Sequence, residues 1–113
     1  MLGHVNNAVF FSYTEFARLE FFGHLGITDQ AFPSCLLARV VANHLKAVHY
    51  GDVVLITTWV SRVGHKSFAV NHEVFANQIL CATFQTVLVW YDHDSKSSLP
   101  VPDAARAKLL EYA

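Results

Sequence analysis

A polar cluster stands almost at the first residue of this 113-residue chain, directly before a long apolar stretch. Gly3-His4-Val5-Asn6-Asn7 combines a titratable imidazole with two amide side chains of the type that caps helices. Unpaired backbone N–H groups at the N-terminus of a helix stabilise negative charge on a bound group. If the apolar stretch is helical, the cluster predicts a site for developing negative charge. The alternative is ordinary helix capping by Asn6.

The apolar stretch is predicted to be a helix from about residue 6 to Leu25, ended by Gly26. With successive residues turned by about 100°, its apolar side chains spread over nearly the whole circumference. Such a pattern predicts a helix that is surrounded by the rest of the domain. Its phenylalanines are interpreted first as core residues, and some are expected to line a small-molecule pocket at a subunit boundary. They are Phe10, Phe11, Phe16, Phe21 and Phe22.

Four apolar segments rich in β-branched residues follow, and turn residues separate them. Residues 66–76 alternate well, and one side carries Phe68, Val70, His72 and Val74. Short connections between long consecutive strands predict an antiparallel meander. The predicted strands cover residues 36–49, 53–63, 66–76 and 79–91, followed by a loop over 92–100 and a closing helix that begins at Pro102-Asp103.

This order predicts an α+β fold in which one antiparallel sheet wraps around one long central helix. A sheet curled around a helix buries one face of each, and a second subunit closes the open side. The length predicts a single domain over residues 1–113. A hydrophobic content of 53% on so small a body predicts that another copy of the chain covers part of it.

Charge and hydropathy exclude several function classes. The net charge of −1 and the pI of about 6.6 provide no basic field for nucleic acid or an anionic membrane. No export leader is recognisable and no apolar run reaches the roughly 18 residues of a membrane span. The expectation is a cytoplasmic protein.

Cysteines and histidines can form disulfides, a Cys-His hydrolase site or a metal site, but their spacing in this sequence supports none of these. Cys35 and Cys81 lie in apolar segments without a CxxC pair, so both are interpreted as reduced, buried side chains. A Cys-His hydrolase lacks a local signature. His44, His49 and His72 do not have the spacing of a zinc site, so no metal is predicted.

The N-terminal cluster and the residues after it resemble the opening helix of the hotdog-fold acyl-CoA thioesterases, in the branch similar to 4-hydroxybenzoyl-CoA thioesterase. The resemblance implies hydrolysis of an acyl-CoA or acyl-carrier-protein thioester by a homodimer or homotetramer. It implies no cofactor, because coenzyme A is part of the substrate. The matching residues are Gly3-His4-Val5-Asn6-Asn7, Phe11, Tyr13, Glu15, Ala17, Arg18, Tyr50-Gly51-Asp52, Gly64, Ser67, Val87 to Asp92, and Pro100 with Pro102.

The resemblance also assigns roles to residues. The backbone N–H of Asn7 would stabilise the thioester oxygen, and His4 would position a polar group or water beside it. Gly3, Val5 and Asn6 complete the substrate-binding segment at the helix start. Lys66 and Ser67 follow a glycine where the family contacts the pantetheine arm and nucleotide of coenzyme A, and a solvated turn is the alternative for these two residues.

The family's acid stands three residues before the glycine, which would precede Met1, and the family's first strand precedes that acid. The resemblance therefore predicts either a start assigned at an internal methionine or a shortened chain. Glu15 is about 12 Å beyond Asn7 along a helix and cannot replace the acid, and it is expected to pair with Arg18. Asp52 and Glu73 cannot be placed from sequence.

Two other functions remain open at this point. A chain without the acid would suit an acyl-thioester binding module that does not turn its ligand over. A hotdog hydratase or dehydratase would need a different His-Asp arrangement, which the sequence does not show.

Overall fold

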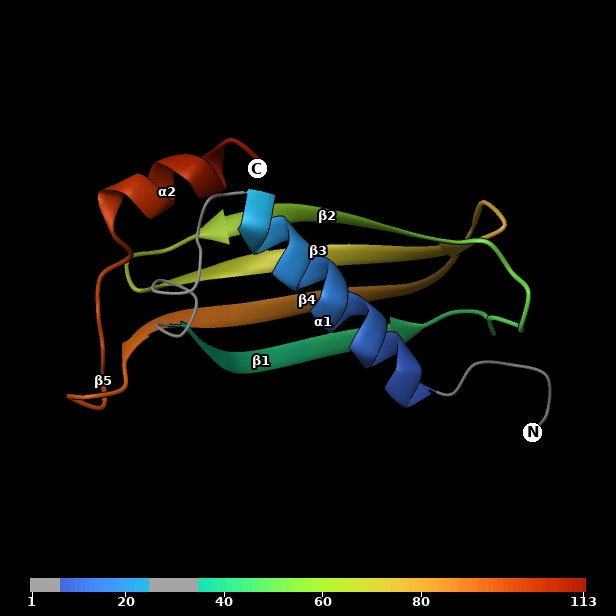
Figure 1. Ribbon diagram of the computed structural model, residues 1–113, viewed down its shortest axis with the longest axis horizontal. Helices are drawn as coiled ribbons and strands as arrows, with labels where there is room; N and C mark the ends of the chain where they lie inside the picture. Colours follow the sequence, from blue (N-terminus) through green and yellow to red (C-terminus); the bar gives the residue numbers. More distant parts are fainter. Residues whose placement is uncertain (1–6, 25–34) are drawn as a thin grey trace.

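A computed structural model of the chain describes residues 7–24 and 35–113, and gives the side chains of residues 13–23 and 35–113. It consists of an antiparallel sheet with one long helix across one face and a short helix at one end (Figure 1). The elements are α1 Asn7–His24, β1 Cys35–His44, β2 Val54–Val63, β3 Ser67–Ala76, β4 Ile79–Asp92, β5 Ser97–Ser98 and α2 Asp103–Leu110.

The strand order is β1-β4-β3-β2, and β5 pairs with the end of β4. β2, β3 and β4 form the predicted meander. Asn77 and Gln78 connect β3 to β4 with φ of 49° and 70°, as a two-residue hairpin turn requires. The prediction that all four long strands form a meander in chain order was wrong, because β1 pairs with β4 and not with β2. The pairing runs from Cys35 opposite Trp90 to His44 opposite Ala82. The 14-residue β4 is long enough to pair over the full length of β1 while β3 occupies its other edge.

The first strand is also shorter than predicted. β1 ends at His44 rather than at residue 49, because the N–H groups of Leu45 and Lys46 both bond to the carbonyl of Cys81, at 2.8 and 3.1 Å. Because both N–H groups share the Cys81 carbonyl, the chain leaves the β1–β4 ladder at this point. Within the predicted loop over residues 92–100, the short β5 adds a rung that the sequence did not indicate.

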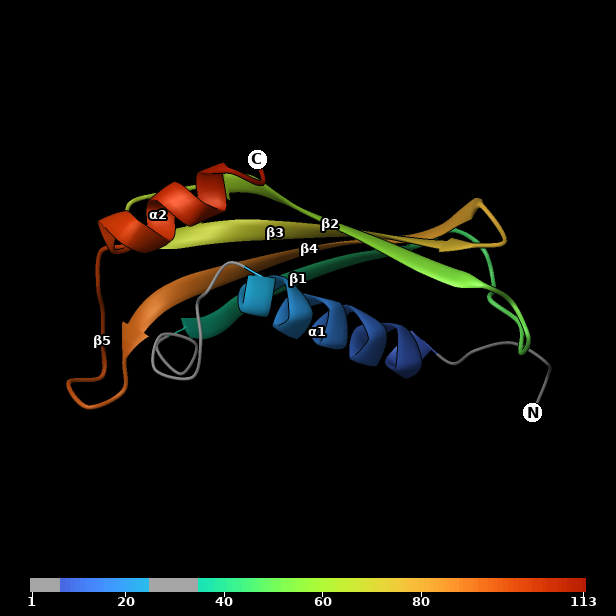
Figure 2. The ribbon, with the colours of Figure 1, turned by 45° about the horizontal axis from the view of Figure 1, so that its top comes forward.

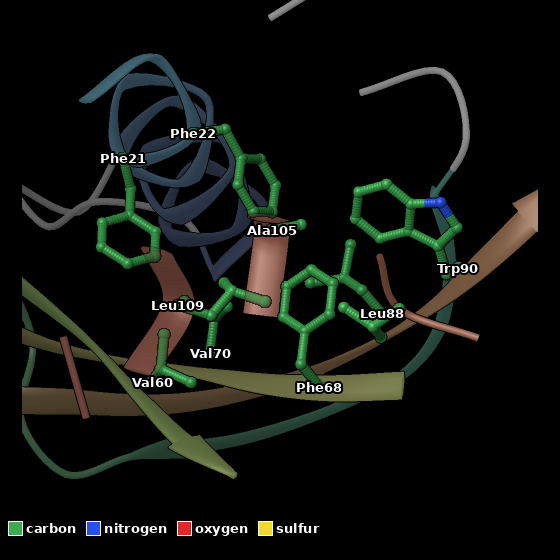
Figure 3. Packing of buried hydrophobic residues seen from close by; sticks show 10 residues of the cluster. Phe21, Phe22, Val60, Phe68, Val70, Leu88, Trp90, Ala105 and Leu109 are labelled. Carbon is green, nitrogen blue, oxygen red and sulfur yellow. The ribbon is translucent and has the colours of Figure 1, made fainter. Parts of the chain in front are cut away.

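One apolar cluster holds both helices to the sheet (Figure 3). Phe21 and Phe22 point from α1 toward the sheet, and Ala105 and Leu109 reach the same cluster from α2. We call this cluster 1; its other buried members are Val60, Phe68, Val70, Leu88, Trp90 and Val101. Cluster 2 lies further along the same strands and consists of Val48, Val74, Ala76, Cys81, Ala82 and Phe84, with Tyr13 of α1 packed against it.

The expectation that α1 is surrounded was wrong for this single chain. Phe16 is 64% exposed and Leu19 is 45% exposed, because a single sheet covers only one side of the helix (Figure 2). Phe21 and Phe22 are core residues as predicted, and Phe16 is not. The side chains of residues 10 and 11 lie outside the described part, as does the predicted helix end at Gly26.

Cys35 and Cys81 are both free thiols. Cys81 is buried as predicted, whereas Cys35 is half-buried. Burial raises the pKa of the Cys35 thiol to about 11, so it resists ionisation. Neither α1 nor α2 is long and apolar enough to cross a membrane.

Candidate active site

The start of α1 is the backbone feature on which the candidate site rests. The 18-residue helix begins at Asn7, and its first turn carries no acidic side chain. The N–H groups of that turn have no partner within the helix, and no carboxylate of the turn compensates the positive end of the helix dipole. Most of the predicted site lies outside the described part of the chain. This applies to Gly3, His4, Val5 and Asn6, and to the side chain of Asn7.

The second predicted contact region is the turn between β2 and β3, which the backbone holds firmly. The N–H of Gly64 donates to the carbonyl of Ser67 at 2.7 Å, and the N–H of Trp90 donates to the carbonyl of Lys66 at 2.8 Å. The carbonyl of His65 accepts from the N–H of Val101 at 2.9 Å. The backbone carbonyls of residues 65–67 are therefore all used in hydrogen bonds, and the side chain of Lys66 is exposed to solvent.

Two arginines reinforce this turn from different elements. The guanidinium of Arg106 on α2 donates to the carbonyl of Gly64 at 2.7 Å and to that of His65 at 3.3 Å. The guanidinium of Arg62, at the end of β2, donates to the hydroxyl of Ser67 at 3.3 Å. The turn that carries Lys66 and Ser67 is therefore a fixed, cationic corner of the fold.

The structure places the two carboxylates, Asp52 and Glu73, that could not be placed from sequence. Asp52 accepts from the backbone N–H of His49 at 2.8 Å and from the side-chain amide of Asn77 at 2.9 Å, so it joins two turns. The His49 hydrogen bond is the main reason why the pKa of Asp52 lies below its ordinary value. Glu73 alternates with His72 and Val74, which are buried on the α1 side of β3, and thus lies on the opposite face of the sheet.

A third polar feature, the pair His72 and Thr58, lies under α1. From the sequence, His72 was considered as a metal ligand and rejected. His72 is fully buried, and its Nδ1 lies 2.9 Å from the hydroxyl of Thr58 on the neighbouring strand. Burial, and to a lesser extent the charge of Arg18, lowers the pKa of His72 to about 4. A histidine opposite a threonine on otherwise apolar strand faces was the available sequence signal. Among the described residues, no three His, Cys, Asp or Glu side chains gather in a way that could hold a metal.

Arg18 faces the domain interior more than its predicted partner. Its side chain is half-buried, whereas Glu15 is exposed. Burial lowers the pKa of the Arg18 guanidinium, and the charge of Glu15 offsets part of this effect. The ion pair between the two residues stays a prediction, and the charge of Arg18 also contributes to the lowered pKa of His72.

An open groove at the β2 edge involves none of the predicted site residues. Its volume is about 810 Å³. It borders the β3–β4 turn and the start of β2, away from the turn that carries Lys66. Its lining residues are Val53, Val54, Leu55, Thr57, Phe75, Asn77 and Gln78.

An antiparallel sheet wrapped along one long helix that begins at Asn7, which follows Gly3-His4-Val5-Asn6 in the sequence, is the arrangement of the hotdog-fold thioesterases. Residues 1–109 match the family model of the thioesterase-like superfamily, and the chain belongs to this superfamily. It is thus a thioester hydrolase, as the resemblance implied.

Solved structures agree with this assignment. The chain is 32% identical to a thioesterase from Thermus thermophilus, crystallised with coenzyme A and zinc, with a TM-score of 0.89 over 98% of this chain and 82% of that one. It is 29% identical to a predicted thioesterase from Bacillus stearothermophilus, with a TM-score of 0.90 over 99% and 85% of the two chains. A gentisyl-coenzyme A thioesterase is 19% identical with a TM-score of 0.80 over 96% and 88%, which supports the fold alone.

Proposed function

We propose that this protein hydrolyses an acyl-CoA thioester to a free acid and coenzyme A, with an acyl-carrier-protein thioester as the alternative carrier. The observation that carries the proposal is the start of α1 at Asn7, directly after Gly3-His4-Val5-Asn6, in a chain of the thioesterase-like superfamily. The coenzyme A bound to the Thermus thermophilus relative supports this choice of substrate. No cofactor is required, because coenzyme A is itself the leaving group.

The proposed chemistry uses the backbone of α1. Attack on the thioester carbonyl places negative charge on its oxygen, and the N–H of Asn7 stabilises that charge in the first turn of the helix. His4 positions the attacking water or a polar group beside it. The tetrahedral intermediate formed with water then collapses, the C–S bond breaks, and the thiolate of coenzyme A takes up the proton that the attacking water gives up.

Lys66 and Ser67 are proposed to contact the coenzyme A portion of the substrate. The ammonium group of Lys66 is exposed next to a turn whose carbonyls bond elsewhere, so its charge is free to meet a phosphate. Arg62, which bonds to Ser67, adds positive charge to the same corner. A turn that only meets solvent is the alternative reading.

The protein is further proposed to be a homodimer or homotetramer with its active sites between subunits. Phe16 and Leu19 on the open side of α1, and Leu37 and Val40 on β1, expose apolar surface. Leu37 and Val40 pair with Leu88 and Thr86, and therefore lie on the α1 side of the sheet. A second copy would cover this surface along β1, which is an edge strand of the described sheet. The two free thiols support a cytoplasmic location.

A thiol-release assay tests the activity directly. The protein, with any residues that its reading frame places before Met1, is incubated with a panel of acyl-CoA esters and a thiol reagent. Release of coenzyme A supports the proposal. Tight acyl-CoA binding without release would instead identify a binding module, and water addition to an enoyl-CoA would identify a hydratase.

A further inference from the structure

The pair Thr58–His72 interrupts the apolar surface that the sheet presents to α1. On β2 and β3, Val60 pairs with Val70 in cluster 1, and the pair Thr58–His72 comes next. The following pair on this face, Ile56–Val74, belongs to cluster 2. On β2 and β3 this polar rung therefore separates the two apolar clusters beneath the helix. Thr86 of β4, opposite Val70, is a further buried polar side chain on the same face.

α1 has two polar residues on its sheet-facing side, the buried Thr14 and the half-buried Arg18. Arg18 lies between Tyr13, which packs on cluster 2, and Phe21 and Phe22, which belong to cluster 1. Its Nε is buried beneath the helix, and its positive charge contributes to the lowered pKa of His72, which agrees with this placement. We call Arg18, Thr58 and His72 the polar layer.

The polar layer has hydrogen-bonding demands that apolar neighbours cannot meet. His72 is fully buried, with Nδ1 at 2.9 Å from the Thr58 hydroxyl. Nε2 of His72 and Nε of Arg18 are buried and have no hydrogen-bond partner among the described residues. If Nδ1–H donates to Thr58, the neutral ring presents an acceptor at Nε2, which suits a nearby guanidinium donor.

Apolar contacts alone define the position of a helix along its axis only weakly, because they are not directional. A polar layer defines it better, since sliding α1 would move Arg18 from the polar Thr58–His72 rung to Val70 or Val74, whose side chains offer no polar atom. Asn7 lies eleven residues before Arg18 on the same helix, about 16 Å along its axis. A helix of this length transmits a shift from one position to the other.

We propose that the Thr58–His72 pair, acting through Arg18, fixes the axial position of α1 on the sheet and thereby positions the Asn7 amide for the thioester oxygen. Thr58 and His72 are positioning residues in this view, and neither touches the substrate. The inference rests on the proposed function for its effect on catalysis. Its effect on the position of α1 is independent of that function.

The test compares two substitutions of Thr58 in the full chain. Thr58→Val preserves the side-chain shape and removes the hydroxyl, whereas Thr58→Ser keeps the hydroxyl and removes a methyl group. Because displacements near 1 Å cost about a hundredfold in rate, Thr58→Val is expected to lower kcat by about ten- to a hundredfold. The KM for acyl-CoA should change less than about twofold, and Thr58→Ser should retain nearly the wild-type kcat.

A second measurement follows the helix itself. In protein labelled with ¹⁵N-asparagine, the Asn7 amide resonance should shift in Thr58→Val and in Arg18→Met, and stay in place in Thr58→Ser. Thermal unfolding of each variant gives the folded fraction, to which kcat is normalised.

A wild-type kcat and an unshifted Asn7 resonance in Thr58→Val would overturn the inference. Equal loss of kcat in both Thr58 variants, in proportion to lost stability, would also overturn it, since a purely structural role predicts that pattern. If the wild-type protein releases no thiol from any acyl-CoA, the proposed function fails. The Asn7 resonance still decides whether the polar layer positions α1.

Discussion

Arg106 on α2 donates a hydrogen bond of 2.7 Å to the backbone carbonyl of Gly64, which lies 42 residues earlier in the chain. The same guanidinium reaches the carbonyl of His65 at 3.3 Å. The β2–β3 turn is thus held by side-chain hydrogen bonds from α2 and by a backbone hydrogen bond from Trp90 of β4 to Lys66. The two contacts give α2 a role in shaping the corner that carries Lys66 and Ser67.

Replacing Arg106 by Gln should loosen this turn. The charged hydrogen bonds to two carbonyls are lost, so we expect a destabilisation of about 1–3 kcal/mol. The KM for acyl-CoA should rise, whereas kcat should change little. Denaturant unfolding and steady-state kinetics measure both effects. Lys108→Ala, on the exposed side of the same helix, is the matched control; an equal effect there would contradict the assignment.

The proposed role of the Asn7 amide is testable because proline is tolerated at the first position of a helix. Asn7→Pro removes the N–H and should lower kcat by about a hundred- to a thousandfold, as loss of an oxyanion-stabilising donor does. Asn7→Ala keeps the N–H and should retain most of the activity. Circular dichroism checks that α1 is intact. Full activity in a folded Asn7→Pro variant would exclude the backbone mechanism.

Lys66 should matter only for substrates that carry the nucleotide. Lys66→Ala removes an exposed ammonium group, and we expect the KM for acyl-CoA to rise several-fold, by about 1 kcal/mol of binding energy. The KM for the corresponding acyl-pantetheine, which lacks the nucleotide phosphates, should stay unchanged. Steady-state kinetics on both substrates makes the comparison. A similar change for both substrates would place Lys66 elsewhere on the binding path.

Burial of His72 predicts a pH dependence of stability. The folded-state pKa of about 4 lies below the ordinary 6.5, so the unfolded chain binds a proton between these values and the folded chain does not. The free energy of unfolding should therefore be level above pH 6.5 and fall toward pH 4. The total loss from this group is about 3 kcal/mol.

Urea unfolding at a series of pH values measures this loss. His72→Leu should flatten the profile between pH 6.5 and 4. Asp52 and Asp92, whose pKa values are lowered by hydrogen bonds, lose their stabilising contribution mainly at the acid end of this window and below it. An unchanged slope in His72→Leu would show that other groups cause it.

The apolar surface on the open side of α1 predicts self-association. Phe16→Asp places a charge where the side chain is now 64% exposed, so the single chain should stay folded while the oligomer dissociates. Sedimentation velocity measures the mass. Glu20→Gln on the same helix is the control, because Glu20 is also exposed. A monomeric wild-type protein would contradict the proposed assembly.

Local chemistry allowed much of the fold to be predicted from the sequence. Alternation along residues 66–76 predicted the buried side of β3, and Asn77-Gln78 predicted a short connection because asparagine is a turn residue that tolerates positive φ. Pro102 before Asp103 predicted where α2 begins. The cluster ending at Asn7 predicted the start of α1 and led to the family.

Non-local relations could not be predicted in the same way. β1 pairs with β4, yet every strand edge offers the same N–H and C=O groups, so the local pattern did not distinguish β2 from β4 as its partner. The exposure of Phe16 follows from the sheet covering one side of α1, although the apolar pattern of the helix suggested that all sides were enclosed.

The amino-acid sequence by itself determined which segments are helix and strand and which superfamily the chain belongs to, because periodicity and motif spacing are local properties. Only the tertiary structure decided that His72 meets Thr58 under α1 and that Arg106 reaches Gly64. Each of these contacts joins residues far apart in the chain. They form only when burial of the apolar clusters brings the strands and helices together, and partnering then offsets the desolvation of the polar groups caught between them.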